Sequence, residues 1–214
     1  LKAGCIAVPM NFRYSGDEIK YCLELADCEV LIFGKEFIER IDTIANDIPD
    51  VKTMFYVGKG GPCYSEDCCA MMNYCSSEAP PVMLKEEDYA AIYFSSGTTG
   101  FPKAILHNHR ALLSSCKTEQ NHHGQTEDDV FLCIPPLYHT GAKMHWFGSL
   151  LSGSKAVLLR GVKPEWILRT ITEEKCTIVW LLVPWAQNML DAIESGRVNL
   201  DDYLLSQWRL MHIG

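Results

Sequence analysis

The feature that most constrains the fold is the alternation of short apolar runs with amphipathic stretches along the 214-residue chain. Residues 15–27 have a helical pattern that opens with the capping-box spacing of Ser15 and Glu18. Alternation of strand and helix predicts an α/β protein with mostly parallel sheets covered by helices. Strands are expected over 29–34, 51–57, 90–94, 130–134, 155–159, 177–182 and 209–213, and helices over 15–27, 35–46, 108–119, 143–151, 164–174 and 184–195.

Charge and hydropathy argue against a nucleic-acid partner and against a membrane span. Apolar residues make up 48 % of the chain, so a buried core is feasible, and the formal net charge is −8. An acidic surface repels a phosphate backbone, so no nucleic-acid partner is expected. The densest apolar stretch, 177–186, is too short to span a bilayer and contains Pro184, so no membrane span is expected.

The chain contains ten cysteines and begins at Leu1 without an initiator Met or a leader pattern. We therefore expect that it starts inside a longer protein. Several cysteines lie within apolar runs, which favours free buried thiols in a reducing cytosol over disulfides and predicts a cytoplasmic location. These cysteines are Cys5, Cys22, Cys133 and Cys176.

Residues 58–81 interrupt the alternation and are predicted to be a surface excursion followed by a linker. The segment carries a cysteine cluster whose spacing lacks the paired C-x2-C pattern of common zinc sites. We therefore expect no metal there, and the role of the cluster stays open. Its members are Cys63, Cys68, Cys69 and Cys75.

Residues 95–103 read Ser-Ser-Gly-Thr-Thr-Gly-Phe-Pro-Lys and have the composition of a phosphate-binding loop. Gly97 and Gly100 let backbone N–H groups approach an anion, and Lys103 supplies a mobile positive charge. Strand 90–94 precedes the loop, which places it at a carboxyl end, where α/β folds bind ligands. The spacing differs from a Walker A motif, and the alternative is an ordinary polar loop with a solvated Lys. Hydroxyl donors come from Ser95, Ser96, Thr98 and Thr99.

This nine-residue string resembles the phosphate loop of the adenylate-forming (AMP-binding) superfamily, which includes acyl-CoA synthetases, luciferases and peptide-synthetase adenylation domains. Residues 1–11 (LKAGCIAVPMN), 135–141 (PPLYHTG) and 177–190 resemble further blocks of the family in the family's order. Ala104 departs from the Gly that usually follows the loop Lys. The closest resemblance is to carboxylate–CoA ligases acting on fatty or aromatic acids.

The resemblance implies a partial N-terminal domain over residues 1–214, with the family's C-terminal domain absent. It subdivides into a first α/β segment over 1–81, which includes the cysteine-rich excursion, and a segment over 82–214 with the phosphate loop. By resemblance, the ribose-binding Asp and the catalytic Lys of the small domain lie beyond the chain. The 214 residues alone are therefore expected to be inactive.

The resemblance also implies the reaction. A carboxylate attacks the α-phosphate of ATP, pyrophosphate leaves, and the acyl group then passes from the adenylate to coenzyme A, with Mg²⁺ accompanying ATP. By resemblance, the residues from Ser95 to Lys103 hold the β- and γ-phosphates, and His139 lies between the acyl pocket and the α-phosphate. Thr140 and Gly141 are expected to line the same pocket. Lys103 and His139 are the expected catalytic residues.

Two alternatives remain from the sequence. One is another adenylate-forming type, with a carrier protein or another acceptor in place of coenzyme A. The other is a nucleotide-binding or oligomerisation module without catalysis, and a homo-oligomer is possible. Among the other histidines, His109 is expected to pack at a helix, while His122 and His123 are expected at a solvated helix end. Trp180 and Trp185 are candidates for an acyl tunnel or for the core.

Overall fold

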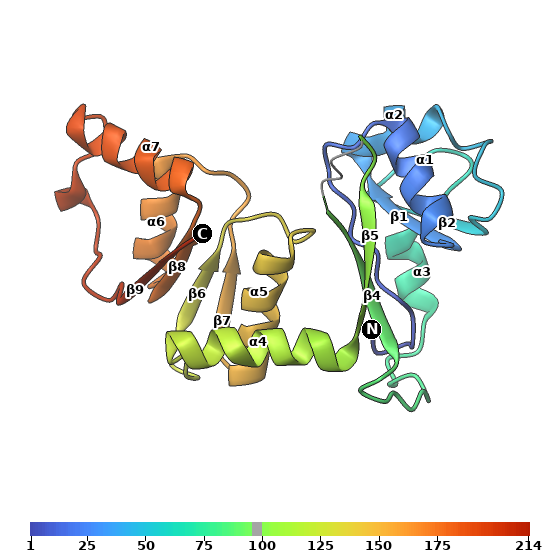
Figure 1. The fold of residues 1–214 in the computed structure, drawn as a ribbon. Coiled ribbons are helices and arrows are strands. Elements are labelled where there is room, and N and C mark those ends of the chain that lie inside the picture. Colours follow the sequence, from blue (N-terminus) through green and yellow to red (C-terminus); the bar gives the residue numbers. More distant parts are fainter. Residues whose placement is uncertain (96–99) are drawn as a thin grey trace. The chain divides into compact units, whose positions relative to one another are not determined.

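A computed structural model describes residues 1–95 and 100–214 of the chain (Figure 1). The chain divides into two compact units, Leu1–His109 and Arg110–Gly214, called unit 1 and unit 2 below. Each unit contains a parallel sheet covered by helices, so the expected α/β class is confirmed. The subdivision expected after residue 81 rests on sequence blocks and stays a prediction.

Unit 1 is built on a three-stranded parallel sheet in the order β1-β2-β3. Its first helix begins as expected, because the Ser15 hydroxyl accepts a hydrogen bond from the Glu18 N–H and the Glu18 carboxylate accepts one from the Ser15 N–H. The elements are α1 (Gly16–Leu25), β1 (Val30–Gly34), η1 (Lys35–Phe37), α2 (Ile38–Asp42), β2 (Thr53–Val57), β3 (Glu66–Asp67) and α3 (Cys68–Tyr74).

One face of this sheet forms the core of unit 1. Alternate residues of β1 and β2 point to opposite faces, so Leu31 and Phe33 are buried while Ile32 is 61 % exposed. Helix α1 contributes Ile19 and Leu23 to the same cluster. Burial of one apolar stripe per helix is what fixes α1 against the sheet.

Residues 58–81 lie at the surface as expected, but they contain a strand and a helix that were not predicted. Strand β3 pairs in parallel with β2, and α3 follows directly, with Asp67 as its N-cap accepting a hydrogen bond from the Ala70 N–H at 2.9 Å. The Asp side chain supplies the helix start that the Gly/Pro content of the segment obscured. Cys63, Cys69 and Cys75 are exposed, and Cys5 is exposed as well, contrary to expectation.

A two-stranded antiparallel hairpin completes unit 1. It consists of β4 (Tyr89–Ser95) and β5 (Lys103–Asn108), and it is the exception to the parallel pattern. Ala90 and Ala91 of β4 are buried, and an isolated parallel bridge joins Ala7 to Ala91. The predicted phosphate loop therefore connects two hairpin strands, and the second of them, β5, was not among the predicted strands.

Unit 2 is built on a four-stranded, fully parallel sheet in the order β7-β6-β8-β9. The predicted strand and helix positions of this unit are confirmed, with ends that shift by a few residues. The elements are α4 (His109–His123), β6 (Val130–Cys133), α5 (Thr140–Ser152), β7 (Lys155–Leu158), α6 (Pro164–Glu174), β8 (Ile178–Leu181), α7 (Val183–Glu194), η2 (Leu200–Asp202) and β9 (Leu210–Ile213).

The sheet of unit 2 is buried on both faces. Leu132 and Val179 pack with residues of α6 and α7, whereas Phe131 and Ile178 pack on the face that carries α5. In Figure 1, α6 and α7 lie together beside β8, and α5 lies beside β6 and β7. Helices on both faces explain the continuous apolar strands of a parallel sheet. In the described part of the chain, none of the helices is both long and apolar enough to cross a membrane.

Candidate functional site

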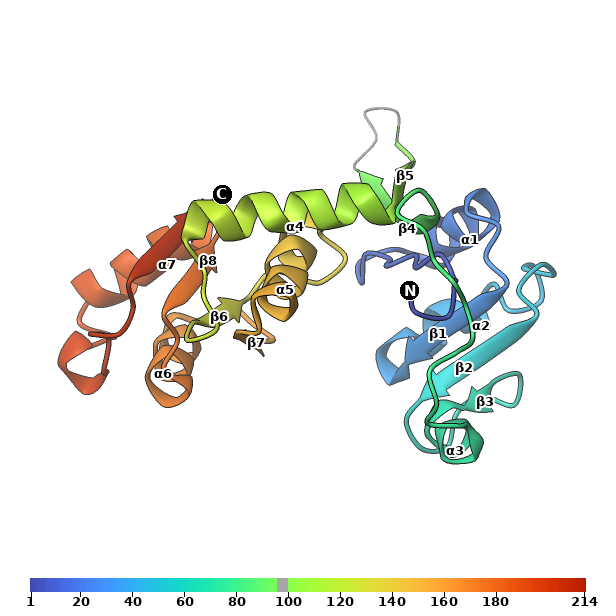
Figure 2. The ribbon, with the colours of Figure 1, turned by 90° about the horizontal axis from the view of Figure 1, so that it is seen from below.

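The hairpin of unit 1 positions the two described ends of the predicted phosphate loop. Ser95, the last residue of β4, is paired with Lys103, the first residue of β5, so both residues lie where the hairpin ladder ends. The two strands are adjacent in Figure 2. Ser96, Gly97, Thr98 and Thr99 were also predicted to bind phosphate, and they lie outside the described residues.

Residues 100–103 lead from the loop into β5 and have two features suited to an anion: the open backbone of Gly100 and the exposed cation of Lys103. Gly100 has a φ of +104°, and a Cβ placed there would have no atom of the described residues within 4 Å, so the backbone is open toward them on that side. Pro102 is buried, and the Phe101 ring lies 4.7 Å from that of Tyr21 in α1. This contact anchors the base of the loop, while Lys103 stays exposed.

His139 lies where β6 leads into α5 in unit 2. Its N–H donates to the Pro136 carbonyl at 3.0 Å, which closes a turn, and its extended backbone makes it the N-cap residue of α5. The imidazole is exposed and lies 4.3 Å, centroid to centroid, from the ring of Tyr138. The following N–H groups open a helix of 13 residues, whose start favours anions.

Thr140 and Gly141 form the first turn of α5. Thr140 is exposed, and Gly141 packs so closely on Trp180 of β8 that a Cβ there would lie 2.3 Å from the indole ring.

Strand β6 lies between β7 and β8, which are reached by connections leading to opposite sides of it. This is the topological switch point of a parallel sheet, where α/β folds bind ligands at the carboxyl ends of strands.

The predicted site residues thus fall into two groups. Ser95 and Lys103 are paired at the end of the hairpin in unit 1, and Gly100 precedes Lys103 by three positions. His139 with its two neighbours lies at the sheet's switch point in unit 2. Each group has polar or cationic side chains exposed to solvent, which is the minimum that binding of a phosphorylated ligand requires.

A third group, made of three histidines and a glutamate, was not predicted from the sequence. His123 was expected at a solvated helix end, but it is only 7 % exposed, because α4 extends to this residue and turns it inward. It joins Glu119, His145 and His212, whose ligand-type atoms all lie within 4.8 Å of one another. His122, one position earlier, is exposed as expected. The local signal available in the sequence was the i, i+4 spacing of Glu119 and His123.

Burial sets the charge of these imidazoles. Desolvation lowers the pKa of His145 to about 3, with further lowering from His123 and His212. Desolvation also lowers the pKa of His123, the neighbouring His212 lowers it further, and Glu119 opposes the shift. Both rings are therefore neutral near pH 7, each with a nitrogen lone pair available to a donor or a metal ion.

Two α/β units with parallel sheets form a fold that matches the N-terminal domains of adenylate-forming enzymes. The sequence model of the AMP-binding enzyme family matches residues 1–214. The chain belongs to this family.

Several relatives are acid–CoA ligases. The chain is 26 % identical over 235 residues to a medium/long-chain-fatty-acid–CoA and 3-oxocholest-4-en-26-oate–CoA ligase of Mycobacterium marinum, covering 99 % of the chain and 42 % of that protein. It is 29 % identical over 157 residues to a long-chain-fatty-acid–CoA ligase of Thermus thermophilus, covering 72 % of the chain and 28 % of the relative. The chain therefore spans about two fifths or less of the length of these relatives.

Solved structures share the fold. The anthranilate CoA ligase AuaEII, solved with anthranoyl-AMP, matches with a TM-score of 0.90 and 25 % identity, over 99 % of this chain and 41 % of that one. The N-terminal domain of FACL13 from Mycobacterium tuberculosis matches with a TM-score of 0.85 and 22 % identity, over 100 % of this chain and 51 % of that one. The second likeness concerns the fold alone.

Proposed function

We propose that this chain is the phosphate-binding part of an ATP-dependent acid–CoA ligase that activates a fatty or aromatic carboxylic acid. The carboxylate oxygen attacks the α-phosphorus of ATP, the bond to the bridging oxygen breaks, and pyrophosphate leaves. The thiol of coenzyme A then attacks the acyl carbon of the adenylate and AMP leaves. The observation that carries the proposal is the family match over all 214 residues, with Ser95 and Lys103 paired at the end of the hairpin.

The chemical demand of the first step is charge control, because an anion attacks a polyanion. Lys103 and the hydroxyl of Ser95 would neutralise and orient the β- and γ-phosphates while pyrophosphate departs. Residues 95–103 contain no carboxylate or imidazole, the side chains that hold metal ions, so they fit Mg²⁺ only as an ion carried on the phosphates. Mg²⁺ would add positive charge beside the leaving pyrophosphate.

At the switch point, His139 would hydrogen-bond the oxygens of the α-phosphate or of the acyl group, since its imidazole is exposed at the first turn of α5. Thr140 would add a hydroxyl donor. Gly141 has a packing reason to lack a side chain, because Trp180 occupies the space of a Cβ. The position of these residues and their chemistry support the proposed roles.

Binding of Mg·ATP and Mg·pyrophosphate to the 214-residue chain, followed by calorimetry, tests the phosphate site. Replacing Lys103 with Ala should weaken both ligands by about tenfold or more, because one charge-assisted contact is lost. Lys59 is also exposed and lies in unit 1, so Lys59→Ala is the matched control and should bind like the wild type. Equal weakening in both variants, or none in either, would remove Lys103 from the phosphate site.

Catalysis is tested with the chain continued to the length of its curated relatives, by pyrophosphate release with a panel of fatty and aromatic acids. His139→Ala should slow adenylate formation by about 10²-fold, while Lys59→Ala keeps the wild-type rate. Normal adenylate formation in the His139 variant would assign that residue a packing role. Release that does not depend on any carboxylate would contradict the proposed reaction class.

A further inference from the structure

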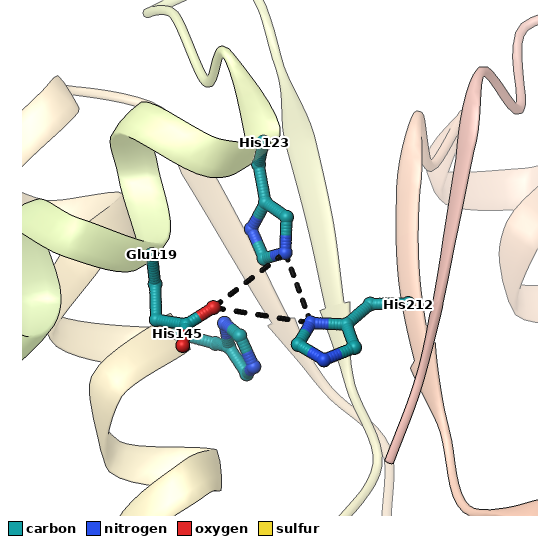
Figure 3. A group of neighbouring side chains, drawn as sticks. All are labelled: Glu119, His123, His145 and His212. Carbon is teal, nitrogen blue, oxygen red and sulfur yellow. Dashed lines mark hydrogen bonds and ion pairs between the residues drawn. The ribbon is translucent and has the colours of Figure 1, made fainter.

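Three elements of unit 2 bring four metal-binding side chains to one place (Figure 3). Helix α4 supplies Glu119 and His123 from one face, α5 supplies His145, and β9 supplies His212. The side chains point toward a common centre in Figure 3. Because they come from segments up to 93 positions apart, the group depends on the packing of the whole unit and not on a local turn.

The spacing of the side-chain atoms suits a small cation. His123 Nε2 lies 2.9 Å from His212 Nδ1, and Glu119 Oε2 lies 3.8 Å from His123 Nε2 and 4.0 Å from His212 Nδ1. In a tetrahedral site with bonds of 2.0–2.1 Å, neighbouring ligand atoms are about 3.3 Å apart. The observed separations, all within 4.8 Å, are close enough to reach that value by small side-chain rotations.

The position of His145 is a second, independent indication of a ligand. It is 2 % exposed, and its Nδ1 has no hydrogen-bond partner among the residues that the structure describes. A buried polar atom without a partner costs about 1–3 kcal/mol, and a bound ion or a buried water is one physical explanation for it. Phe131 stacks on the ring at 4.8 Å and Trp180 meets it edge-on at 4.9 Å, which holds the imidazole in place.

We propose that Glu119, His123, His145 and His212 bind a divalent transition-metal ion, with Zn²⁺ favoured by the donor set of three imidazoles and one carboxylate. The ion can enter from solvent, because the side chains of Glu119 and His212 are 24 % and 30 % exposed. Mg²⁺ prefers oxygen ligands, so this site differs in kind from one that accompanies ATP. The bound ion would link α4, α5 and β9 and so stabilise unit 2.

The competing explanation is a metal-free hydrogen-bonded cluster, in which one imidazole of the pair His123 and His212 donates to the other. Both explanations place the same residues together, but they differ in what removal of a ligand does. A metal site loses affinity for the ion when any ligand is replaced, whereas a hydrogen-bonded cluster has no such affinity to lose.

The experiment uses the purified 214-residue chain, freed of metal with a chelator and treated with N-ethylmaleimide so that exposed cysteines cannot bind the ion. Zn²⁺ is titrated by calorimetry, and Co²⁺ is titrated by absorption. We expect one ion per chain with a Kd below about 1 μM, and a tetrahedral Co²⁺ spectrum without a sulfur-to-cobalt charge-transfer band. Zn²⁺ should also raise the Tm by about 5 °C or more.

Variants on one helix provide the matched comparison. His123→Ala should weaken Zn²⁺ binding by about 100-fold, and His122→Ala, one position away and exposed, should leave it within about twofold of the wild type. Glu119→Gln and His212→Asn change partly exposed ligands, so they test the site even if a variant of a buried His fails to fold. Each should weaken binding by about tenfold or more.

Three results would overturn the proposal. One is a folded wild-type chain, judged by circular dichroism, that does not bind Zn²⁺ or Co²⁺. Another is His123→Ala binding as tightly as His122→Ala. The third is a Co²⁺ spectrum with sulfur ligands, which would move the ion to the cysteines. The ATP and pyrophosphate measurements do not depend on these outcomes, so the proposed function can stand or fall separately.

Discussion

The hairpin of unit 1 and the sheet of unit 2 both carry candidate site residues, but their strands differ in how deeply they are buried. Strand β5 is exposed along most of its length, with Ile105 45 % and Leu106 46 % exposed. In contrast, Phe131 and Val179 of the unit 2 sheet are completely buried. A parallel sheet with helices on both faces fixes the carboxyl ends of its strands by core packing, whereas in the hairpin only β4 is packed and β5 is held mainly by its ladder with β4.

The two units also differ in their tryptophans and exposed cysteines, which can serve as chemical reporters. All tryptophans of the chain, Trp146, Trp166, Trp180, Trp185 and Trp208, belong to unit 2. Every exposed cysteine belongs to unit 1: Cys5, Cys63, Cys69 and Cys75. Tryptophan fluorescence therefore reports on unit 2, and thiol labelling under native conditions reports mainly on unit 1, so the two units can be followed separately in one sample.

The largest expected difference between the units is in thiol reactivity. Cys116, Cys133 and Cys176 of unit 2 are all buried, and burial raises the pKa of Cys133 to about 12 and that of Cys176 to about 11. They should react with N-ethylmaleimide at least about a hundredfold more slowly than the exposed thiols of unit 1, because they need an opening of the core. Pulsed labelling followed by peptide mass spectrometry measures this ratio.

Cys22 is the internal control for that experiment, because it belongs to unit 1 but is buried, with its pKa raised to about 12 by burial and by Glu18. It should react as slowly as the thiols of unit 2. Fast labelling of Cys22 beside slow labelling of Cys133 would show that unit 1 opens more readily as a whole. Similar rates for exposed and buried thiols would contradict the packing described for both units.

The second prediction compares a core residue with an exposed one. Leu168 of α6 is fully buried in unit 2, so Leu168→Ala should lower the free energy of unfolding of that unit by about 2–5 kcal/mol. Ile105→Ala removes an apolar side chain from the exposed hairpin strand and should leave the unit 2 transition unchanged. Urea titrations followed by tryptophan fluorescence give both values.

Comparison of that fluorescence transition with far-UV circular dichroism sharpens the result. If the units unfold independently, Leu168→Ala shifts only the part of the dichroism transition that coincides with tryptophan fluorescence. A shift of the tryptophan transition by Ile105→Ala would show instead that the two units unfold together.

The features that the sequence predicted are those encoded by neighbours along the chain. The capping box at Ser15 is complete within four residues, and the loop from Ser95 to Lys103 is a contiguous string. Strand β5 and its pairing with β4 were missed, because the apolar run that follows the glycine-rich loop is too short to show a period. The cluster around His145 was missed because three separate elements build it, and only packing brings them together.

The third prediction compares Asp129 of unit 2 with Glu29 of unit 1. The Asp129 carboxylate is almost fully buried and accepts hydrogen bonds from Arg209 at 2.7 and 2.9 Å and from the Thr177 hydroxyl at 2.6 Å. These contacts tie the start of β6 to the segments before β8 and β9. Asp129→Asn should lower the free energy of unfolding at pH 7 by about 1.5–3 kcal/mol. In unit 1, Glu29→Gln breaks the exposed pair with Lys52 and should cost about 1 kcal/mol or less.

The pH dependence of stability distinguishes the Asp129–Arg209 ion pair from a simple packing effect. The Arg209 guanidinium, followed by the Thr177 hydroxyl, holds the pKa of Asp129 well below its usual range. An unfolded Asp titrates near about 3.9, so the unfolded chain takes up this proton first as the pH falls. The stabilisation of the folded state by the Asp129 carboxylate is fully present above that pH, and it is lost as the pH drops toward the lower native pKa. The difference between wild type and Asp129→Asn in tryptophan-detected urea unfolding should therefore shrink between pH 5 and pH 3, and a constant difference would assign the loss to packing alone.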